Sequence, residues 1–306
     1  MKIDKENFAQ LVNQAMQVSH VSHMRSVIEK ELLHYDILFA LDKGRLLDRL
    51  TFQGGTSLRL CYGGNRFSED LDFAGGKDFS SAMLADMKGC IEKYIGERYG
   101  LEVTVKEPKD LKKDPKYSEL SIDKWQIAVV TSPERKDLPK QKIKVEVANI
   151  PAYTREPQSL QVNYDFLPDG YGDTLILTES LDEVMADKII ALPATTKYIR
   201  YRDIWDLAWL QQKGATLNME LVRNKISDYK LEQFSNVLEN FLERLPDIVS
   251  SEGFIEEMKR FLPTDIFDRT LAKDKFQIYL KNTLEKLFKS VSDELSGNIT
   301  TFEFKM

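Results

Sequence analysis

Three acidic residues stand at spacings that suit metal-dependent chemistry on phosphates: Asp70, Asp72 and Glu146. Asp70 and Asp72 are separated by one residue in a segment that alternates polar and apolar side chains, as a half-buried strand does. On such a strand both carboxylates leave one face, while Leu71 and Phe73 leave the other toward a core. Paired carboxylates suit Mg²⁺, with Mn²⁺ as a substitute.

Glu146 is the candidate third carboxylate. In the run from Ile143 to Val147 the apolar side chains share one face, which leaves Lys144 and Glu146 on the other. Two metal ions about 3.5–4 Å apart usually require a further acid beside the first pair. We therefore predict that Asp70, Asp72 and Glu146 are the metal ligands of a catalytic site.

Two glycines lie upstream of the acids. Gly54 and Gly55 follow a short predicted strand, residues 49–53, and precede a brief predicted helix that begins at Thr56 and includes Ser57. Glycines let a backbone approach a triphosphate closely, and a helix N-terminus offers free N–H groups to anions. Alone, the glycines would more often form a tight turn; with the acids downstream, they indicate a phosphate-binding site.

A second group of charged residues falls in a helical region. Lys188 lies on the apolar face of a predicted helix, where an ammonium must either extend outward to solvent or meet an anion. A triphosphate or Asp203 would serve as that anion. The pattern alone favours Asp203 as a structural acid paired with Arg200 or Arg202, and Asp206 as a packing or surface residue.

The segment from Lys197 to Arg202 alternates cationic and aromatic residues, with the order Lys-Tyr-Ile-Arg-Tyr-Arg. Such interleaving suits a nucleotide base or a single-stranded RNA end. Packing of the helix that follows explains the two tyrosines equally well, so the motif leaves both interpretations open.

The elements that must position these residues form two parts, and the predicted fold class is α+β. Residues 1–175 are predicted to form a domain with N-terminal helices and a mixed central β-sheet flanked by helices, and residues 176–306 an all-helical domain. The predicted strands of the first part, beside those above, are 101–105, 125–130 and 142–147, with a helix at 80–99. The predicted helices of the second part are 184–192, 199–212, 219–229, 231–245 and 276–295.

Composition sets limits on the class of protein. The 306 residues carry 43 Lys and Arg against 49 Asp and Glu, a net charge of −6, so contact with nucleic acid would need local basic patches. The two cysteines, Cys61 and Cys90, make no disulfide framework, and no stretch is apolar enough for a membrane span. We expect a cytoplasmic protein, and the absence of G-x-S-x-G and Walker motifs disfavours common hydrolases and P-loop enzymes.

Taken together, the segments 54–60 and 66–73 resemble the AbiEii/AbiGii toxin family of nucleotidyltransferases, within the DNA polymerase β-like superfamily. The later segments 186–188 and 201–207 match the same pattern. The resemblance implies a bacterial toxin of a toxin–antitoxin or abortive-infection (phage-defence) system, with an AbiEi-type antitoxin encoded nearby. It also implies transfer of NMP from an NTP; in the related MenT-type toxins the acceptor is a tRNA 3′ end.

Carried over residue by residue, the resemblance implies that Asp70 and Asp72 bind metal, that Lys188 binds the triphosphate, and that Asp203 is a further essential acid. The predicted nucleotide-binding residues are Gly54, Gly55, Thr56, Ser57, Arg66, Ser68 and Lys188. One departure is Glu146, where the superfamily more often has Asp, and its longer arm would change the metal geometry. Two alternatives stay open: a protein-modifying (AMPylator-like) nucleotidyltransferase, and a non-catalytic module that binds nucleotide or RNA.

Overall fold

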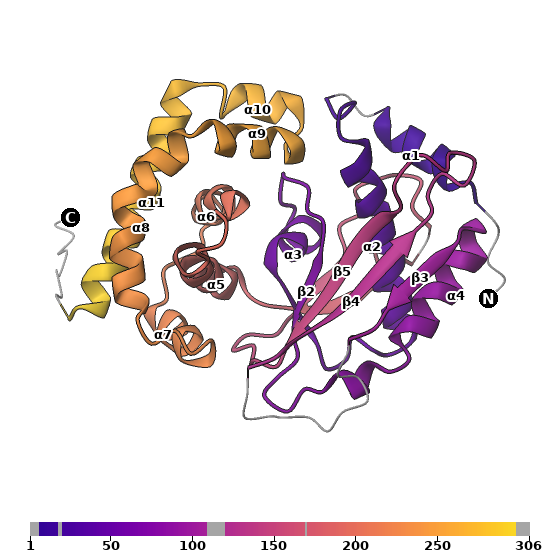
Figure 1. Cartoon of the computed structure of the whole chain (residues 1–306), viewed down its shortest axis with the longest axis horizontal. Coiled ribbons are helices and arrows are strands. Elements are labelled where there is room, and N and C mark those ends of the chain that lie inside the picture. The colour runs from indigo at the N-terminus through magenta and orange to yellow at the C-terminus, as the bar shows by residue number, and fades with distance from the viewer. Residues whose placement is uncertain (1–5, 18–19, 109–119, 169, 298–306) are drawn as a thin grey trace. The chain divides into compact units, whose positions relative to one another are not determined.

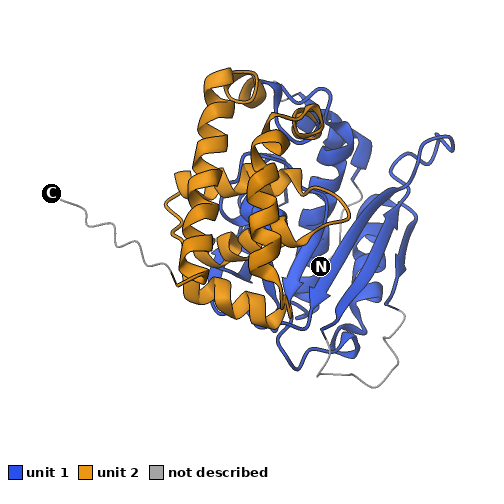
Figure 2. Ribbon diagram, turned by 60° about the vertical axis from the view of Figure 1, so that its left-hand side comes forward, with its two compact units in different colours: residues 1–180, 260–264 blue, residues 181–259, 265–306 orange. Residues whose placement is uncertain are grey.

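The computed structural model describes residues 6–17, 20–108, 120–168 and 170–297. The chain divides into two compact units (Figure 2). Unit 1 comprises residues 1–180 and 260–264, and unit 2 comprises residues 181–259 and 265–306. The boundary expected between residues 175 and 176 falls inside a strand of unit 1, and the chain leaves that unit at Ser180.

Unit 1 combines helices with a single mixed sheet (Figure 1). Its helices are α1 (Phe8–Met16), α2 (Arg25–Lys43), α3 (Gly54–Cys61), the 3₁₀ turn η1 (Ser81–Leu84) and α4 (Met87–Tyr99). Its strands are β1 (Thr51–Gln53), β2 (Leu71–Ala74), β3 (Val103–Lys106), β4 (Ile122–Val129), β5 (Gln141–Ala148), β6 (Glu156–Ser159) and β7 (Leu175–Thr178). The predicted helix 80–99 is interrupted, since η1 and α4 are separate elements.

Within the described residues the sheet has seven strands in the order β3-β4-β5-β2-β1-β7-β6. β2 pairs in parallel with β5, and β1 pairs in parallel with β7, while the other neighbours are antiparallel. The predicted mixed central sheet is therefore confirmed. The sequence did not indicate β6 and β7, which are short and lack a continuous alternating pattern.

Alternation of side chains gives the central strands one apolar and one polar face. Phe73 of β2, Val145 of β5 and Trp125 of β4 are fully buried and belong to one hydrophobic core. Helix α2 packs on α4 and β5, and α4 packs on β3, so these two helices contribute to the same core. The opposite face of β2 and β5 carries the charged residues, as the alternation predicted.

Unit 2 is helical throughout its described residues, which confirms the expected all-helical C-terminal region. Its helices are α5 (Leu181–Ala194), α6 (Tyr201–Gln212), α7 (Met219–Asp228), α8 (Phe234–Ser250), most of α9 (Glu252–Phe261), most of α10 (Thr264–Arg269) and α11 (Asp274–Leu295). Helix α5 packs against α6, α7 and α8, and α11 packs along α8 and α6. The sequence did not anticipate α9 and α10, and α8 is longer than the predicted 231–245.

None of the helices in the described parts of the chain combines the length and the apolar character that a bilayer span requires.

Candidate active site

The predicted metal ligands meet on one face of the sheet, because β2 and β5 run side by side in parallel. Asp72 pairs with Glu146 in the register of these strands, and Leu71 pairs with Val145. Residues that pair in a parallel ladder point to the same face, so Asp72 and Glu146 share the polar face. Asp70 precedes β2 by one residue, and its carboxylate accepts a hydrogen bond from the backbone N of Lys144 at 3.0 Å.

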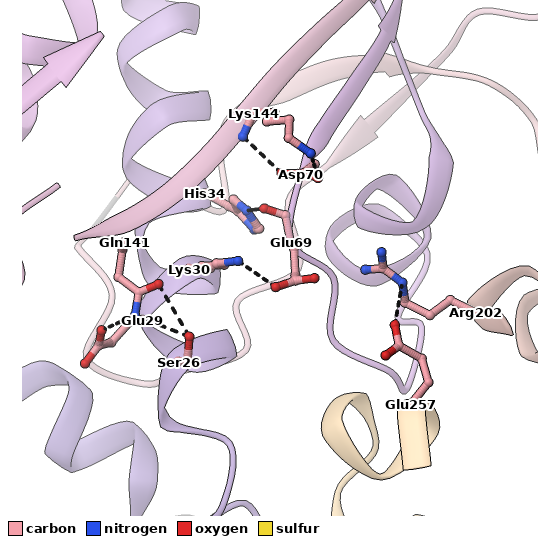
Figure 3. Close-up of polar contacts among 10 residues, drawn as sticks. All are labelled: Ser26, Glu29, Lys30, His34, Glu69, Asp70, Gln141, Lys144, Arg202 and Glu257. Carbon is pink, nitrogen blue, oxygen red and sulfur yellow. Dashed lines mark hydrogen bonds and ion pairs between the residues drawn. The ribbon is translucent and has the colours of Figure 1, made fainter. Parts of the chain in front are cut away.

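Two lysines accompany these carboxylates. The Lys144 Nζ lies 3.4 Å from Asp70 Oδ2, a contact drawn in Figure 3. The Lys124 Nζ lies 2.9 Å from Glu146 Oε1, because Lys124 and Glu146 are opposite each other in the antiparallel ladder of β4 and β5. Both lysine side chains are more than half exposed, at 51% for Lys144 and 56% for Lys124.

The electrostatics of this face favour a cation. The Asp70 carboxylate, with smaller contributions from Glu146 and Asp72, raises the pKa of Lys144 above its usual value, although partial burial opposes the effect. All three carboxylates therefore act on the position of one ammonium group. This is the field that a divalent cation would experience at the same place.

The carboxylates of Asp70, Asp72 and Glu146 do not converge on one point as the ligands of a metal ion do. Among the residues that the structure describes, no three His, Cys, Asp or Glu side chains are arranged closely enough to hold a metal ion. The lysines account for this, because Asp70 is directed to Lys144 and Glu146 to Lys124. Asp70 and Asp72 still fit Mg²⁺ by their oxygen chemistry, shared face and exposure. Glu146 would have to leave Lys124 to join them.

The two glycines form the first turn of helix α3 rather than a turn that precedes it, which corrects the predicted start of this helix at Thr56. Gly54 has φ +78°, a conformation that side chains disfavour, and a Cβ there would lie 2.9 Å from Asp72 Oδ2. A Cβ at Gly55 would lie 2.2 Å from Arg66 Nη2. The glycines thus allow the carboxylate of Asp72 and the guanidinium of Arg66 to lie directly against the start of α3.

The hydroxyl groups predicted to bind nucleotide have backbone partners. The Thr56 Oγ1 donates to the Asp70 carbonyl, and Ser57 Oγ donates to the Gly54 carbonyl at 2.9 Å. Both side chains are almost fully buried, and Ser68 is buried as well. The Thr56 bond joins the start of α3 to the segment that enters β2, and the Ser57 bond lies within the first turn of α3. Nucleotide binding by Thr56, Ser57 and Ser68 remains a prediction.

Helix α2 supports the same segment from its other side (Figure 3). Lys30 Nζ lies 2.6 Å from Glu69 Oε1, and His34 Nε2 lies 2.9 Å from the Glu69 carbonyl. A carbonyl only accepts, so His34 must carry its hydrogen on Nε2. Burial lowers the pKa of His34, despite the opposing effects of the Glu69 carbonyl and the Glu31 carboxylate, so the ring is neutral at pH 7.

In unit 2, Lys188 of α5 and Asp203 of α6 belong to a buried charged group. Lys188 Nζ lies 2.7 Å from Asp203 Oδ1 and 2.7 Å from Asp206 Oδ2, and all three side chains are about 95% buried. Arg200 also pairs with Asp203. Burial alone would raise the pKa of Asp203, but Lys188 and Arg200 hold it well below its usual range.

These contacts decide between the alternatives for the lysine. Lys188 does not extend to solvent, and Asp203 is one of its anions, as the apolar position of the lysine suggested. Asp206, expected as a packing or surface residue, is a second buried partner of Lys188. Arg200, and not Arg202, pairs with Asp203; Arg202 lies 3.8 Å from Glu257 of α9 (Figure 3).

Sequence reasoning missed the contribution of Lys124 to the carboxylate face. The predicted strand began at Trp125, one residue after it, whereas β4 begins at Ile122 and is paired along its whole length. Lys144 was placed on the polar face, but the alternation did not show that it contacts Asp70. An extended alternating pattern in residues 122–129 is the signal that would have found Lys124.

Comparison with known proteins agrees with this fold. The model of the family described as "Nucleotidyl transferase AbiEii toxin, Type IV TA system" matches residues 36–288. The match covers most of the chain, with parts of both units, and spans every predicted site residue. The chain therefore belongs to the AbiEii family and is a nucleotidyltransferase of the toxin–antitoxin class.

Among solved structures, the chain is similar to MenT4, a nucleotidyltransferase toxin from Mycobacterium tuberculosis H37Rv, with a TM-score of 0.53 and 18% identity over 96% of this chain and 100% of that one. At this identity the likeness shows the fold. Two Helicobacter pylori proteins also match: JHP933, with TM-score 0.47, 19% identity and coverage of 89% and 94%, and a putative nucleotidyltransferase, with TM-score 0.49, 20% identity and coverage of 89% and 96%. No curated protein matches the sequence.

Proposed function

We propose that this nucleotidyltransferase transfers NMP from an NTP to an RNA acceptor, namely the 3′ end of a tRNA, with Mg²⁺ as the metal. The observation that supports the proposal is the pairing of Asp72 with Glu146 across β2 and β5, with Asp70 on the same face and the start of α3 against Asp72. This juxtaposes acidic oxygens with the N-terminus of α3, and a metal-bound triphosphate can use both.

Asp70 and Asp72 would hold Mg²⁺, and Glu146 would complete the set after releasing Lys124. When bound, the metal supplies charge neutralisation of the phosphates and lowers the cost of charge development in the transfer. The first turn of α3 would receive phosphate oxygens on its backbone N–H groups. Lys144, whose pKa these carboxylates raise, adds a positive charge close to the same face.

In the reaction, the acceptor hydroxyl oxygen forms a bond to the α-phosphorus of the NTP, and the bond from that phosphorus to the bridging oxygen breaks. Pyrophosphate leaves, and the hydroxyl proton passes to a carboxylate and then to solvent. Glu146 is the residue we assign to accept it. Positioning and charge neutralisation would supply most of the rate.

Lys188 and Asp203 complete the proposal through the family pattern, as a triphosphate ligand and an essential acid. Their ion pair in unit 2 supports a shared role, since a change in either residue removes a buried partner of the other. We also propose that the toxin acts in the cytoplasm as part of phage defence, and that its antitoxin is of the AbiEi type and encoded nearby.

The test is to incubate the full chain with each of four α-³²P-labelled NTPs, Mg²⁺ and cell extract, and then to treat the products with RNase or protease. The proposal expects label in RNA of tRNA size, sensitive to RNase and absent when EDTA is added. Label that is sensitive only to protease would identify a protein-modifying transferase. If no macromolecule is labelled, the chain is a nucleotide- or RNA-binding module and the proposed reaction is wrong.

A further inference from the structure

Unit 2 contains a cavity between α8 and the segment that joins α5 to α6. Its volume is about 430 Å³, within the range of about 300–1,000 Å³ that small-ligand sites occupy. The lining residues come from three stretches of sequence: Leu192, Pro193 and Thr195–Ile199, then Val237, Asn240 and Phe241, then Arg244 and Ile248. The cavity therefore includes the start of the alternating cationic and aromatic segment from Lys197 to Arg202.

The floor and the rim of this cavity differ in chemistry. Leu192, Phe241 and Ile248 are buried and present an apolar floor. Tyr198 stands at the rim with 62% of its surface exposed, so its ring is available to a ligand. Packing of the following helix does not account for Tyr198, which precedes α6 by three residues. An exposed aromatic ring beside an apolar floor suits a flat ring of the ligand.

The charges at the rim are of one sign. Lys197 and Arg244 are both exposed, and neither makes an ion pair with any described residue. The residues that line the cavity include no Asp or Glu. Two cations without a compensating carboxylate favour an anion, and they do not favour a divalent metal. The cavity thus combines an aromatic face, an apolar floor and two positions for negative charge.

We propose that this cavity binds one nucleotide of a single-stranded RNA segment, with the base stacked on Tyr198 over the apolar floor and the flanking phosphates bound by Lys197 and Arg244. The inference rests on the proposed function, since it supplies an RNA-binding site for that reaction. A free NTP suits the cavity less well. A triphosphate carries several charges and travels with Mg²⁺, which no lining residue would ligate, whereas two phosphodiesters match two cations.

The stacking contact is tested by the fluorescence anisotropy of a labelled single-stranded RNA of eight nucleotides, with the full chain and no NTP. Loss of one base–aromatic stack costs about 1–3 kcal/mol, so Tyr198→Ala should raise the dissociation constant for the RNA by about 5- to 150-fold. Tyr198→Phe retains the ring and should bind nearly as the unchanged protein does. Unlabelled ATP as competitor distinguishes a site for free nucleotide from one for RNA.

The phosphate contacts are tested by salt dependence. Each phosphate neutralised on a single strand contributes about −0.7 to the slope of log K against log salt. The double variant Lys197→Gln/Arg244→Gln should therefore lose about 1.4 from the magnitude of this slope. The matched control is Lys286→Gln/Lys289→Gln, which removes two exposed charges of α11 outside the cavity and should leave the slope almost unchanged.

Equal RNA affinity and equal salt slope in the cavity variants and the control would overturn the inference, as would ATP displacing the RNA from the cavity at micromolar concentration. These results differ from a failure of the proposed function. If extract RNA is labelled, and the cavity variants label it with unchanged KM for RNA, the reaction stands and the cavity proposal falls. If only protein is labelled, the RNA reaction itself is wrong.

Discussion

Lysines meet carboxylates in both units, but the two regions differ in exposure. On the sheet face of unit 1, Lys144 and Lys124 pair with Asp70 and Glu146 while more than half of each lysine side chain is exposed. In unit 2, Lys188 is 5% exposed and lies 2.7 Å from Asp203. Exposed pairs contribute about 0–1 kcal/mol, whereas breaking a buried pair costs about 3–5 kcal/mol.

The comparison indicates which carboxylates are free to exchange partners. Solvent screens the pairs of unit 1, so a divalent cation can replace an ammonium there at small cost. In unit 2 a ligand that took Lys188 from Asp203 and Asp206 would leave two buried carboxylates short of positive charge. The same ion-pair chemistry therefore gives readily exchanged pairs in one unit and tightly held pairs in the other, so a triphosphate at Lys188 would have to bind an ammonium that keeps Asp203 and Asp206 as partners.

The largest effect we expect is on activity, from Asp72→Asn. The substitution keeps the shape of the side chain against Gly54 but removes the charge that would hold the metal. NMP incorporation should fall at least about 100-fold, because metal-mediated charge stabilisation is worth several kcal/mol and each 1.36 kcal/mol is a factor of ten. The control is Asp137→Asn, an exposed acid that pairs with Arg135. Retained incorporation by a folded Asp72→Asn protein would refute the metal assignment.

The next effect is on stability and contrasts one lysine from each region. Lys188→Met should lower the free energy of unfolding by about 3–5 kcal/mol, since it leaves Asp203 and Asp206 buried without their ammonium. Lys124→Met should change it by less than about 1 kcal/mol. Urea unfolding followed by circular dichroism measures both. Similar losses of unfolding free energy in the two variants would show that the difference in burial does not change what these ion pairs contribute to stability.

The side-chain pattern predicted this contrast only in part. Alternation in residues 70–73 and 143–147 correctly gave the polar face of the sheet, because a period of two fixes which side chains share a face. Which residues contact one another on that face depends on the register between strands. Lys124 lies opposite Glu146 on β4 and β5, two strands that a long connection separates. A local pattern does not contain such a pairing.

In unit 2 the apolar surroundings of Lys188 predicted that it needs an anion, and Asp203 was among the candidates. The pattern did not reveal that Asp206 is a second ion-pair partner of Lys188, because it placed Asp206 as a packing or surface residue of the helix. Helix α10 spans too few turns to give a clear period, whereas α9 is as long as α7 and is amphipathic, but was not predicted. The glycines of α3 were interpreted as a turn, and their contacts with Asp72 and Arg66 depend on tertiary structure.

The third, smaller effect is on the pH dependence of stability and comes from His34, a buried histidine of unit 1. Burial holds the pKa of His34 below its usual value of 6.5, so the unfolded chain binds a proton that the folded chain does not. The associated stability is present above about pH 6.5 and is lost as the pH falls toward the folded pKa, by at most about 1.4 kcal/mol per pH unit.

His34→Gln keeps an amide donor for the Glu69 carbonyl and removes the titration. Urea unfolding at pH 7.5, 6.5 and 5.5 should therefore show a smaller loss of stability in acid for this variant than for the unchanged chain. The other two histidines are present in both proteins and cancel in the difference. Identical pH dependence of the two proteins would mean that folding does not lower the pKa of His34.

The smallest expected effect is on metal binding by the carboxylates on the polar face of the sheet. If the Lys144 ammonium competes with a cation for Asp70, Lys144→Met should tighten Mn²⁺ binding by about two- to fivefold, a small change because the lysine is half exposed. Lys124→Met is the matched variant for Glu146. Calorimetric titration with Mn²⁺ measures both, with Asp72→Asn as the reference for a lost site.

Tighter binding in both variants would support Glu146 as a ligand, because releasing it from Lys124 then helps the metal. Tighter binding only in Lys144→Met would restrict the metal to Asp70 and Asp72, and unchanged binding in both would show that the lysines and the cation do not share these carboxylates.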